Sequence, residues 1–324
     1  MGLSVVASGL LATFALIVIG AVLRTRLRFG DAFWADLERL AYWVLLPALL
    51  LLGLAGADFV GIAVGRAVAA LVGSALVAAL LALVTRRLVV GGDGPAFTSV
   101  FQGTVRFNNY IGLTVVTTLF GSHGLSLAAL ANAVLIPAGN ILSILVLARH
   151  GDQGDGRPGV VRAVVTNPLV LACAVGLLLN AASRTSAGAA LWDWPPTHLL
   201  LSTAVTLLGV LGQAALPVGL LCVGAGLRIP VAWTAVVRVL SWTVALRLVV
   251  VPAATLLACR LLDLSGPSAV TVVVFAALPT ASSSYVLARR LGGDAPLMAN
   301  ITATQTAVAF LTLPAWILLS QTLL

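Results

Sequence analysis

The sequence predicts an all-α polytopic membrane protein with ten transmembrane helices arranged as two inverted five-helix repeats. Three observations lead to this fold class. The 324 residues are 60% hydrophobic and only 9% charged, whereas a soluble domain carries about 25% charged residues. Ten long apolar stretches follow one another, and the second half of the chain repeats motifs of the first. Because charge this sparse cannot cover a soluble domain, we treat the chain as one membrane-embedded unit.

The apolar stretches predict the individual helices. A helix rises about 1.5 Å per residue, so about 20 apolar residues cross a hydrocarbon core of about 30 Å. The first stretch has its arginines after the apolar run, so we interpret it as a retained span and not as a signal peptide. The predicted spans are 4–23, 34–57, 60–84, 96–119, 124–147, 163–182, 199–227, 239–262, 267–288 and 296–320.

The arginines predict the orientation. All 18 basic residues are Arg, and only Arg184 and Arg260 lie in one of the two families of loops. The other family holds twelve, so the positive-inside rule makes it cytoplasmic and puts both termini outside. The glycine-rich segment 151–162 is then a cytoplasmic linker between repeats 1–150 and 163–324. No basic stretch interleaved with aromatic residues is present, so a nucleic-acid partner is not expected.

Two motifs recur between the halves. Leu46-Pro47 of the second span returns as Leu216-Pro217 of the seventh, and Gly94-Pro95 before the fourth span returns as Gly266-Pro267 before the ninth. Chance similarity between apolar helices is the alternative, but the nearly equal offsets of the two motifs, 170 and 172 residues, argue against it. Five spans is an odd number, so the second repeat enters the membrane from the opposite side. Inverted repeats with discontinuous helices are typical of secondary transporters.

Polar residues inside the fourth and ninth spans predict a binding site. Arg106 begins a polar island in an apolar helix, where an arginine is costly unless it faces a cavity or the protein interior. At the equivalent place in the ninth span, Pro279 removes a backbone donor, so the helix can break there. For the hydroxyl residues, the alternative is a role in helix packing. For Arg106, the alternative is a structural role or a side chain that snorkels to the cytoplasmic surface. The predicted substrate-binding residues are Arg106, Asn108, Asn109, Pro279, Thr280, Ser282 and Ser283.

Further polar residues lie on the helices that follow the two broken spans. They could line a cavity or form interhelical hydrogen bonds, and both interpretations stay open. Arg66 and Arg247 lie within about nine residues of a span end, so we expect both to snorkel and to be structural. The supporting residues are Asn132, Asn300, Thr304 and Gln305.

The distribution of acidic residues limits the function further. Every Asp and Glu, including the single Glu, Glu38, is predicted in a loop or at a span end, so no carboxylate occupies the midplane. A carrier driven by an intramembrane carboxylate is therefore disfavoured. The usual motifs of membrane enzymes and metal sites are missing, so no enzyme activity, catalytic residue, metal or cofactor is expected.

The motifs QGTVRFNNYIGL (102–113) and ALPTASSSYVLARRLGGD (277–294) resemble those of the auxin efflux carrier family, in its bacterial permease type. The resemblance covers essentially the whole chain. It implies a fold like that of bile-acid and sodium/proton carriers, with scaffold helices 4–57 and 163–227 and transport helices 60–147 and 239–320. It also implies a small organic anion as substrate, residence in the bacterial inner membrane, and a homodimer. Many members carry a proline where this chain has Thr114, which leaves the break in the fourth span open.

Together these features predict a secondary transporter that exports small organic anions, auxin-like or carboxylate, by alternating access. The alternative is a sodium- or proton-coupled symporter of organic acids, with sodium bound near Asn132 and Gln305. A channel and a membrane-embedded enzyme are the other classes considered. The exact substrate, the direction, the coupling ion and the oligomeric state are not determined by the residues alone.

Overall fold

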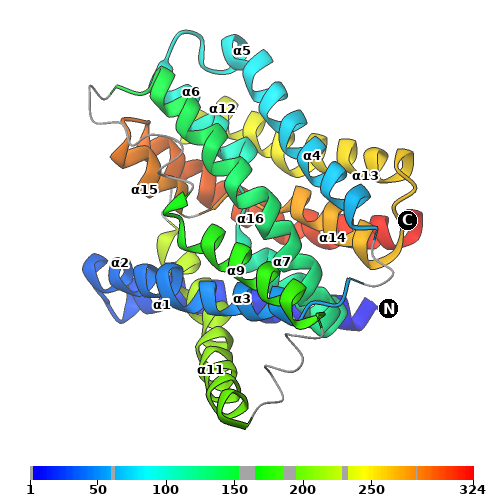
Figure 1. The fold of residues 1–324 in the computed structure, drawn as a ribbon. Helices are drawn as coiled ribbons and strands as arrows, with labels where there is room; N and C mark the ends of the chain where they lie inside the picture. Colours follow the sequence, from blue (N-terminus) through cyan, green and yellow to red (C-terminus); the bar gives the residue numbers. More distant parts are fainter. Residues whose placement is uncertain (1–2, 60–62, 153–164, 186–194, 228–232, 282) are drawn as a thin grey trace.

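The computed structural model describes residues 3–59, 63–152, 165–185, 195–227, 233–281 and 283–324, and nearly all of these are helical (Figure 1). Ser282 and most of the predicted linker 151–162 lie outside the described residues. The helices are α1 (Leu3–Arg26), α2 (Asp31–Leu40), η1 (Ala41–Leu45), α3 (Leu46–Ala55), α4 (Val64–Val84), α5 (Arg86–Val90), α6 (Gly94–Val105), α7 (Asn109–His150), α9 (Pro168–Ser183), α11 (Pro195–Gly226), α12 (Trp233–Ala245), η2 (Leu246–Val250), α13 (Val251–Leu261), α14 (Gly266–Ala277), α15 (Ser283–Arg290) and α16 (Ala295–Leu323).

Every predicted span contains helix, but the number of membrane crossings stays a prediction. Six stretches of the described chain are long and apolar enough to cross a bilayer. One of them, Gly94–His150, contains 57 residues, and would be about 85 Å long as a straight helix, far more than a bilayer requires. Pro168–Ser183 and Gly266–Ala277 are apolar but shorter. The described chain is thus a polytopic, nearly all-helical membrane protein.

The long stretch reverses direction inside α7. Gly121 has φ 60° and ψ −137°, a backbone conformation outside the helical region, which glycine adopts at little cost because it has no Cβ. Three residues later, Gly124 lies so close to the Val116 carbonyl that a Cβ would overlap it. The two parts of α7 therefore meet at a tight turn, at the place where the sequence predicts the boundary between the fourth and fifth spans.

Two π-helical segments interrupt otherwise α-helical stretches. The segment η1 ends two residues before Pro47, and η2 ends two residues before Pro252. A proline lacks the N–H that would complete the α-helical pattern, and such bulges are frequent at functional sites. This places Arg247 of η2 in a widened turn in the interior of the protein.

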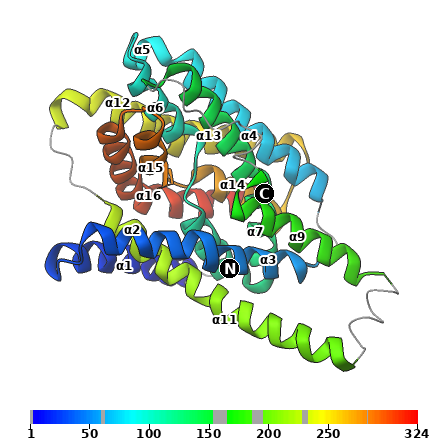
Figure 2. The same cartoon turned by 60° about the vertical axis from the view of Figure 1, so that its left-hand side comes forward.

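The helices pack in two groups. Helices α1, α3, α9 and α11 contact one another, and α4, α6, α13, α14 and α16 form a second set of contacts. Helix α7 contacts members of both groups. Figures 1 and 2 show α1, α3 and α11 on one side of the molecule and α4, α13 and α14 on the other. These two groups resemble the predicted sets of scaffold and transport helices. That one group moves against the other remains a prediction.

The second group contains two interrupted helices. Helix α6 ends at Val105, and Arg106 and Asn108 are extended before α7 begins. Helix α14 ends at Ala277, and Leu278 is extended before α15 begins. The first interruption lies at the polar island, at residues 106–108, and so precedes Thr114. It therefore forms although this chain has no proline at position 114.

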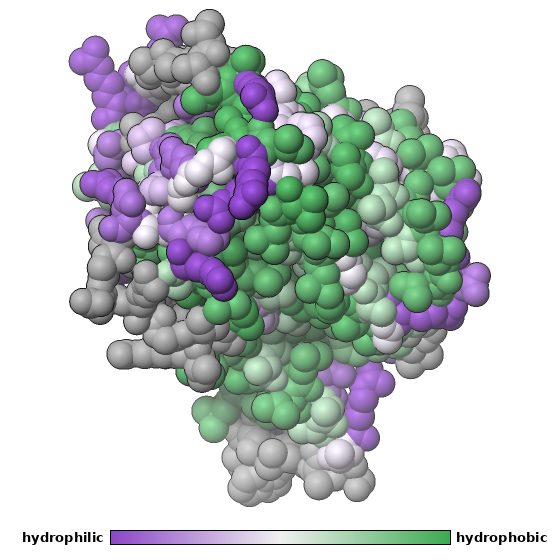
Figure 3. Space-filling model, turned by 90° about the horizontal axis from the view of Figure 1, so that it is seen from above, coloured by the Kyte–Doolittle hydropathy of each residue, from purple (hydrophilic) through white to green (hydrophobic). Residues whose placement is uncertain are grey.

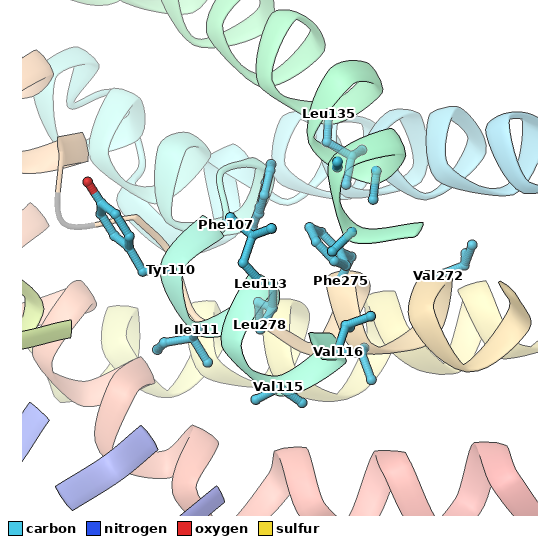
Figure 4. Close-up of a cluster of buried hydrophobic side chains, with 14 of the residues drawn as sticks. Phe107, Tyr110, Ile111, Leu113, Val115, Val116, Leu135, Val272, Phe275 and Leu278 are labelled. Carbon is cyan, nitrogen blue, oxygen red and sulfur yellow. The ribbon is translucent and has the colours of Figure 1, made fainter. Parts of the chain in front are cut away.

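Apolar side chains hold the two interruptions together. The Phe107 and Phe275 rings lie 5.6 Å apart, centroid to centroid, and Ile111, Leu113 and Leu278 are fully buried beside them (Figure 4). Because lipid tails are as apolar as these side chains, their contribution to stability comes from close van der Waals packing between the helices. On the outside, Figure 3 shows hydrophobic residues over the centre and right of the face, with hydrophilic residues gathered at its upper left and at its right edge.

Candidate functional site

The two interruptions meet through their backbones. The N–H of Asn108 donates a hydrogen bond to the carbonyl oxygen of Pro279, at 2.8 Å. The side-chain oxygen of Asn108 accepts from the N–H groups of Tyr110 and Ile111, at 3.1 and 3.2 Å, and so caps the start of α7. Asn108 is 1% exposed, and its Nδ2 has no hydrogen-bond partner among the described residues. The Asn108 side chain therefore caps the start of α7 and keeps one amide donor available. It does so where the two interruptions meet, which we call the crossing.

A narrow cavity of about 50 Å³ lies at the start of α7. Arg106, Asn108, Asn109 and Ser283 line it, and Arg106 Nη2 donates to the Ser283 hydroxyl at 3.1 Å. These residues come from both interrupted helices. The contact brings together two residues that are 177 positions apart in the sequence.

A wider cavity of about 550 Å³ shares Arg106 and Ser283 with the narrow one. Tyr42 and Asn140 also line both, whereas Asn167 lines only the wider cavity. A third cavity of about 640 Å³ extends beside α2 and is lined by Arg24 and Arg289, among others. These two arginines belong to the segments predicted as cytoplasmic, so on that prediction the third cavity lies towards the cytoplasmic side.

The electrostatics of the narrow cavity combine one cation, one anion and two helix ends. Arg106 is the cation and Glu38 the anion. Helices α7 and α15 both begin here, and a helix N-terminus carries roughly half a positive charge on its free N–H groups. The arrangement can therefore hold a carboxylate against Arg106, with amide and hydroxyl donors completing its hydrogen bonds.

The predicted site residues divide into two groups. Arg106, Asn108, Asn109 and Ser283 line the cavity, and Pro279 contributes its carbonyl to the crossing. Thr280 instead points into the protein: it is fully buried, its N–H donates to Gln305 Oε1 at 2.9 Å and its hydroxyl to the Gln102 carbonyl at 3.2 Å. Ser282 lies outside the described residues. Binding of a substrate by the lining residues stays a prediction.

Among the supporting residues, Gln305 forms interhelical hydrogen bonds. Its Nε2 donates to the Gly103 carbonyl at 2.9 Å and to the Thr243 carbonyl at 3.2 Å. Asn132 Nδ2 donates to the carbonyl of Ala128 in the same helix, at 2.8 Å. Asn300 is partly buried, and the hydroxyl of Thr304 is a buried group without a partner among the described residues. None of these four residues is among those lining the three cavities described above.

Sequence reasoning missed Glu38 and Tyr42. Glu38 lies in α2 and lines all three cavities, so a carboxylate predicted only at a span end lies beside the predicted site residues. The signal that could have identified Glu38 was its position as the single Glu of the chain inside a predicted span.

Arg247 also differs from expectation: it is 4% exposed and does not snorkel, because backbone carbonyls in the interior satisfy its guanidinium. Arg66 is exposed and donates to the Asp263 carbonyl at 2.8 Å.

Comparisons with known proteins agree with this architecture. Residues 158–317 match the family described as membrane transport protein. Over 318 residues, the chain is 26% identical to an uncharacterized transporter of Methanothermobacter thermautotrophicus, covering 94% of this chain and 95% of that protein. The protein is thus a multi-pass membrane transporter. The family match over residues 158–317 and the whole-chain similarity to this transporter confirm the resemblance to the auxin efflux carrier family indicated by the motifs.

Proposed function

We propose that this transporter exports small organic anions across the cytoplasmic membrane by alternating access. The observation that supports this most is the position of Arg106, whose guanidinium lines the narrow and wide cavities at the interruption between α6 and α7. An arginine at this depth is costly unless it faces water or a partner. A substrate carboxylate would accept two parallel hydrogen bonds from its planar fork.

The surroundings of Arg106 support a carboxylate more than an amine. The positive dipole ends of α7 and α15 lie at the cavity, and Asn108 and Asn109 supply amide donors. Glu38 reduces the positive potential, which favours a substrate with one carboxylate, or with a hydrogen-bond donor near Glu38, over a highly charged anion. An inside-negative potential then drives export by about 2.3 kcal/mol per charge per 100 mV.

The placement of the candidate site between the two helix groups supports alternating access. The third cavity lies beside Arg24 and Arg289, in segments predicted as cytoplasmic, which supports assigning this structure to an inward-facing state. Export requires a second state in which the site faces outside. Movement of the α4, α6, α13, α14 and α16 group against α1, α3, α9 and α11 would supply it.

The first experiment is a thermal-shift screen of the purified protein against small carboxylates, amines and neutral metabolites. A ligand at about 100 times its Kd stabilises the folded state by about 2.7 kcal/mol. We expect carboxylates to raise the unfolding midpoint of the native protein and not of Arg106→Gln. Arg260→Gln, which changes an exposed arginine, is the matched control. Stabilisation by amines alone, or an equal response of Arg106→Gln, would refute the anion assignment.

Transport is then measured in proteoliposomes with the carboxylate that the screen identifies. A carrier shows saturation and counterflow, in which unlabelled substrate on one side accelerates movement of labelled substrate from the other. Flux that is linear in concentration and shows no counterflow would indicate a channel instead. Arg106→Gln is expected to lower saturable transport at least tenfold relative to Arg260→Gln.

Proton coupling is the second candidate, and Glu38 favours it. A carboxylate that lines the same cavity as Arg106 is suitably placed to bind a proton when the substrate leaves. Under that mechanism, a pH gradient would drive transport by the native protein, and Glu38→Gln would abolish this drive. Potential-driven export predicts the opposite result, namely a response to membrane potential that Glu38→Gln preserves.

A further inference from the structure

Arg247 contacts the backbone of both interrupted helices, and no charged side chain of the described residues is its partner. It is 4% exposed and belongs to the π-helical segment η2. Its guanidinium donates to the carbonyl oxygens of Leu278, Phe275 and Thr104, at 2.7, 3.0 and 3.3 Å. The salt bridges in the described part of the chain involve Arg24 and Arg184 and not Arg247. Only main-chain oxygens therefore compensate its charge in these contacts.

These oxygens belong to the ends of two helices. Thr104 lies in the last turn of α6, Phe275 lies in the last turn of α14, and Leu278 follows directly. The last carbonyls of a helix lack intrahelical partners and together carry roughly half a negative charge. Two such ends meeting in the interior amount to about one negative charge, which one guanidinium balances. Phe275 and Leu278 lie next to Phe107 in Figure 4, which shows how closely the two interruptions approach.

Gln305 completes the same arrangement. It donates to the Gly103 carbonyl, one residue before Thr104, and accepts from the N–H of Thr280, two residues after Leu278. Its oxygen is therefore already used as an acceptor. The carbonyl groups of Thr104, Phe275 and Leu278 form a cluster of oxygen atoms of the kind that binds a hard monovalent cation when no protein group fills it.

We propose that the guanidinium of Arg247 takes the place of a bound metal cation at the crossing. It fills the cluster of carbonyl oxygens in which a cation-coupled carrier would bind its ion. In this chain the two helix ends are neutralised permanently, so the crossing binds no sodium during the transport cycle. The transport part of this inference rests on the function proposed above. The role of Arg247 at the helix ends does not, because it follows from the contacts alone.

Removal of the Arg247 side chain tests this role by chemical rescue. Arg247→Ala opens a space bordered by the three carbonyl oxygens, so we expect low millimolar guanidinium, or sodium in place of choline, to raise its unfolding midpoint in a saturable manner. The native protein should not respond. Arg66→Ala is the matched control, because Arg66 also donates to two carbonyls, of Leu262 and Asp263, but at an exposed position. A folded Arg247→Ala protein that responds to neither cation, or a native protein that responds equally, would overturn the proposal.

Two further variants keep the test decisive if Arg247→Ala does not fold. Arg247→Lys retains a cation and Arg247→Met retains most of the volume without charge. We expect Lys to preserve a midpoint near that of the native protein and Met to lower it clearly. Equal midpoints for Lys and Met would show that the charge is irrelevant and contradict the proposal.

Transport distinguishes this inference from the proposed function. Uptake by the native protein should be the same in sodium and in choline, whereas Arg247→Ala should gain a severalfold response to sodium or guanidinium. Sodium-dependent uptake by the native protein with Arg247 in place would refute the inference and leave anion transport intact. If no carboxylate is transported but guanidinium still rescues Arg247→Ala, the proposed function fails and the role of Arg247 at the helix ends stands.

Discussion

The N–H of Asn108 and the carbonyl oxygen of Pro279 form a hydrogen bond of 2.8 Å that joins the two interrupted helices. Each residue lies where its own helix has lost its regular pattern, so each has a backbone group that helix geometry leaves unpaired. The bond satisfies both groups at once. Neither interruption is therefore an independent feature, and the site between them depends on both halves of the chain.

Asn108→Ala should destabilise the protein by about 1 kcal/mol, the usual cost of removing an N-cap. The mutation leaves the Tyr110 and Ile111 N–H groups without the Asn108 oxygen. Asn108→Asp keeps an acceptor there, so stability should be retained while the added negative charge weakens binding of carboxylates. Denaturant unfolding and carboxylate thermal shifts measure the two effects. Equal stability of native protein and Asn108→Ala would show that the cap is unimportant.

Gln305→Leu should lower stability by about 3 kcal/mol, because it leaves the Thr280 N–H and the Gly103 and Thr243 carbonyls buried without their partner. The partly exposed Gln321, near the end of the same helix, provides the control variant Gln321→Leu, expected to change stability by less than about 0.5 kcal/mol. Unfolding midpoints of the two variants are compared. A similar small effect for both would contradict the network described here.

Two glycines of α11 should respond to alanine with opposite signs. A Cβ at Gly219 would overlap the ring of Tyr110, whereas one at Gly209 would meet nothing within 4 Å. Gly219→Ala should therefore cost about 1–3 kcal/mol through overpacking, and it should also disturb the cavity that Tyr110 lines. Gly209→Ala should gain up to about 1 kcal/mol, because alanine favours helix. Thermal unfolding of both variants, with transport rates, tests this pair.

The starts of the two interrupted helices provide a further matched pair. The Asp93 side chain accepts from the Ala96 N–H at 2.9 Å at the start of α6, whereas Ser265 makes no such cap at the start of α14. Asp93→Ala should thus cost about 1 kcal/mol, and Ser265→Ala close to nothing. Stability measurements that reverse this order would show that the two starts are not capped as the contacts indicate.

Much of the architecture was predictable from hydropathy and a few punctuating residues. The apolar stretches located most helices within a few residues but missed the short helix α5, and Pro279 together with the island beginning at Arg106 pointed to the places where the two interruptions lie. Gly121 marked the turn inside α7. These features are local: they depend on side-chain transfer energies, missing backbone donors and the conformational freedom of glycine, all of which can be recognised in the chain itself.

The direction in which each polar side chain points was not predictable. Thr280 was expected in the site but is bonded to Gln305 and Gln102, and Glu38 was expected at a span end but lines the cavity with Arg106. A transmembrane helix that is apolar on all sides has little periodicity to indicate which face is buried in protein. The contacts between helices decide it, and these join residues far apart in sequence.

The sequence by itself indicated a helical membrane transporter with a break in the ninth span, because hydrophobicity and backbone breaks act locally, whereas it left the break in the fourth span open. Only the tertiary structure decided that Arg247 lies between the ends of α6 and α14 and that Arg106 faces Ser283 across the cavity. The physical reason is that a buried guanidinium is stable only where acceptor groups from separate elements converge on it. Such convergence exists only once the two halves of the chain have packed together.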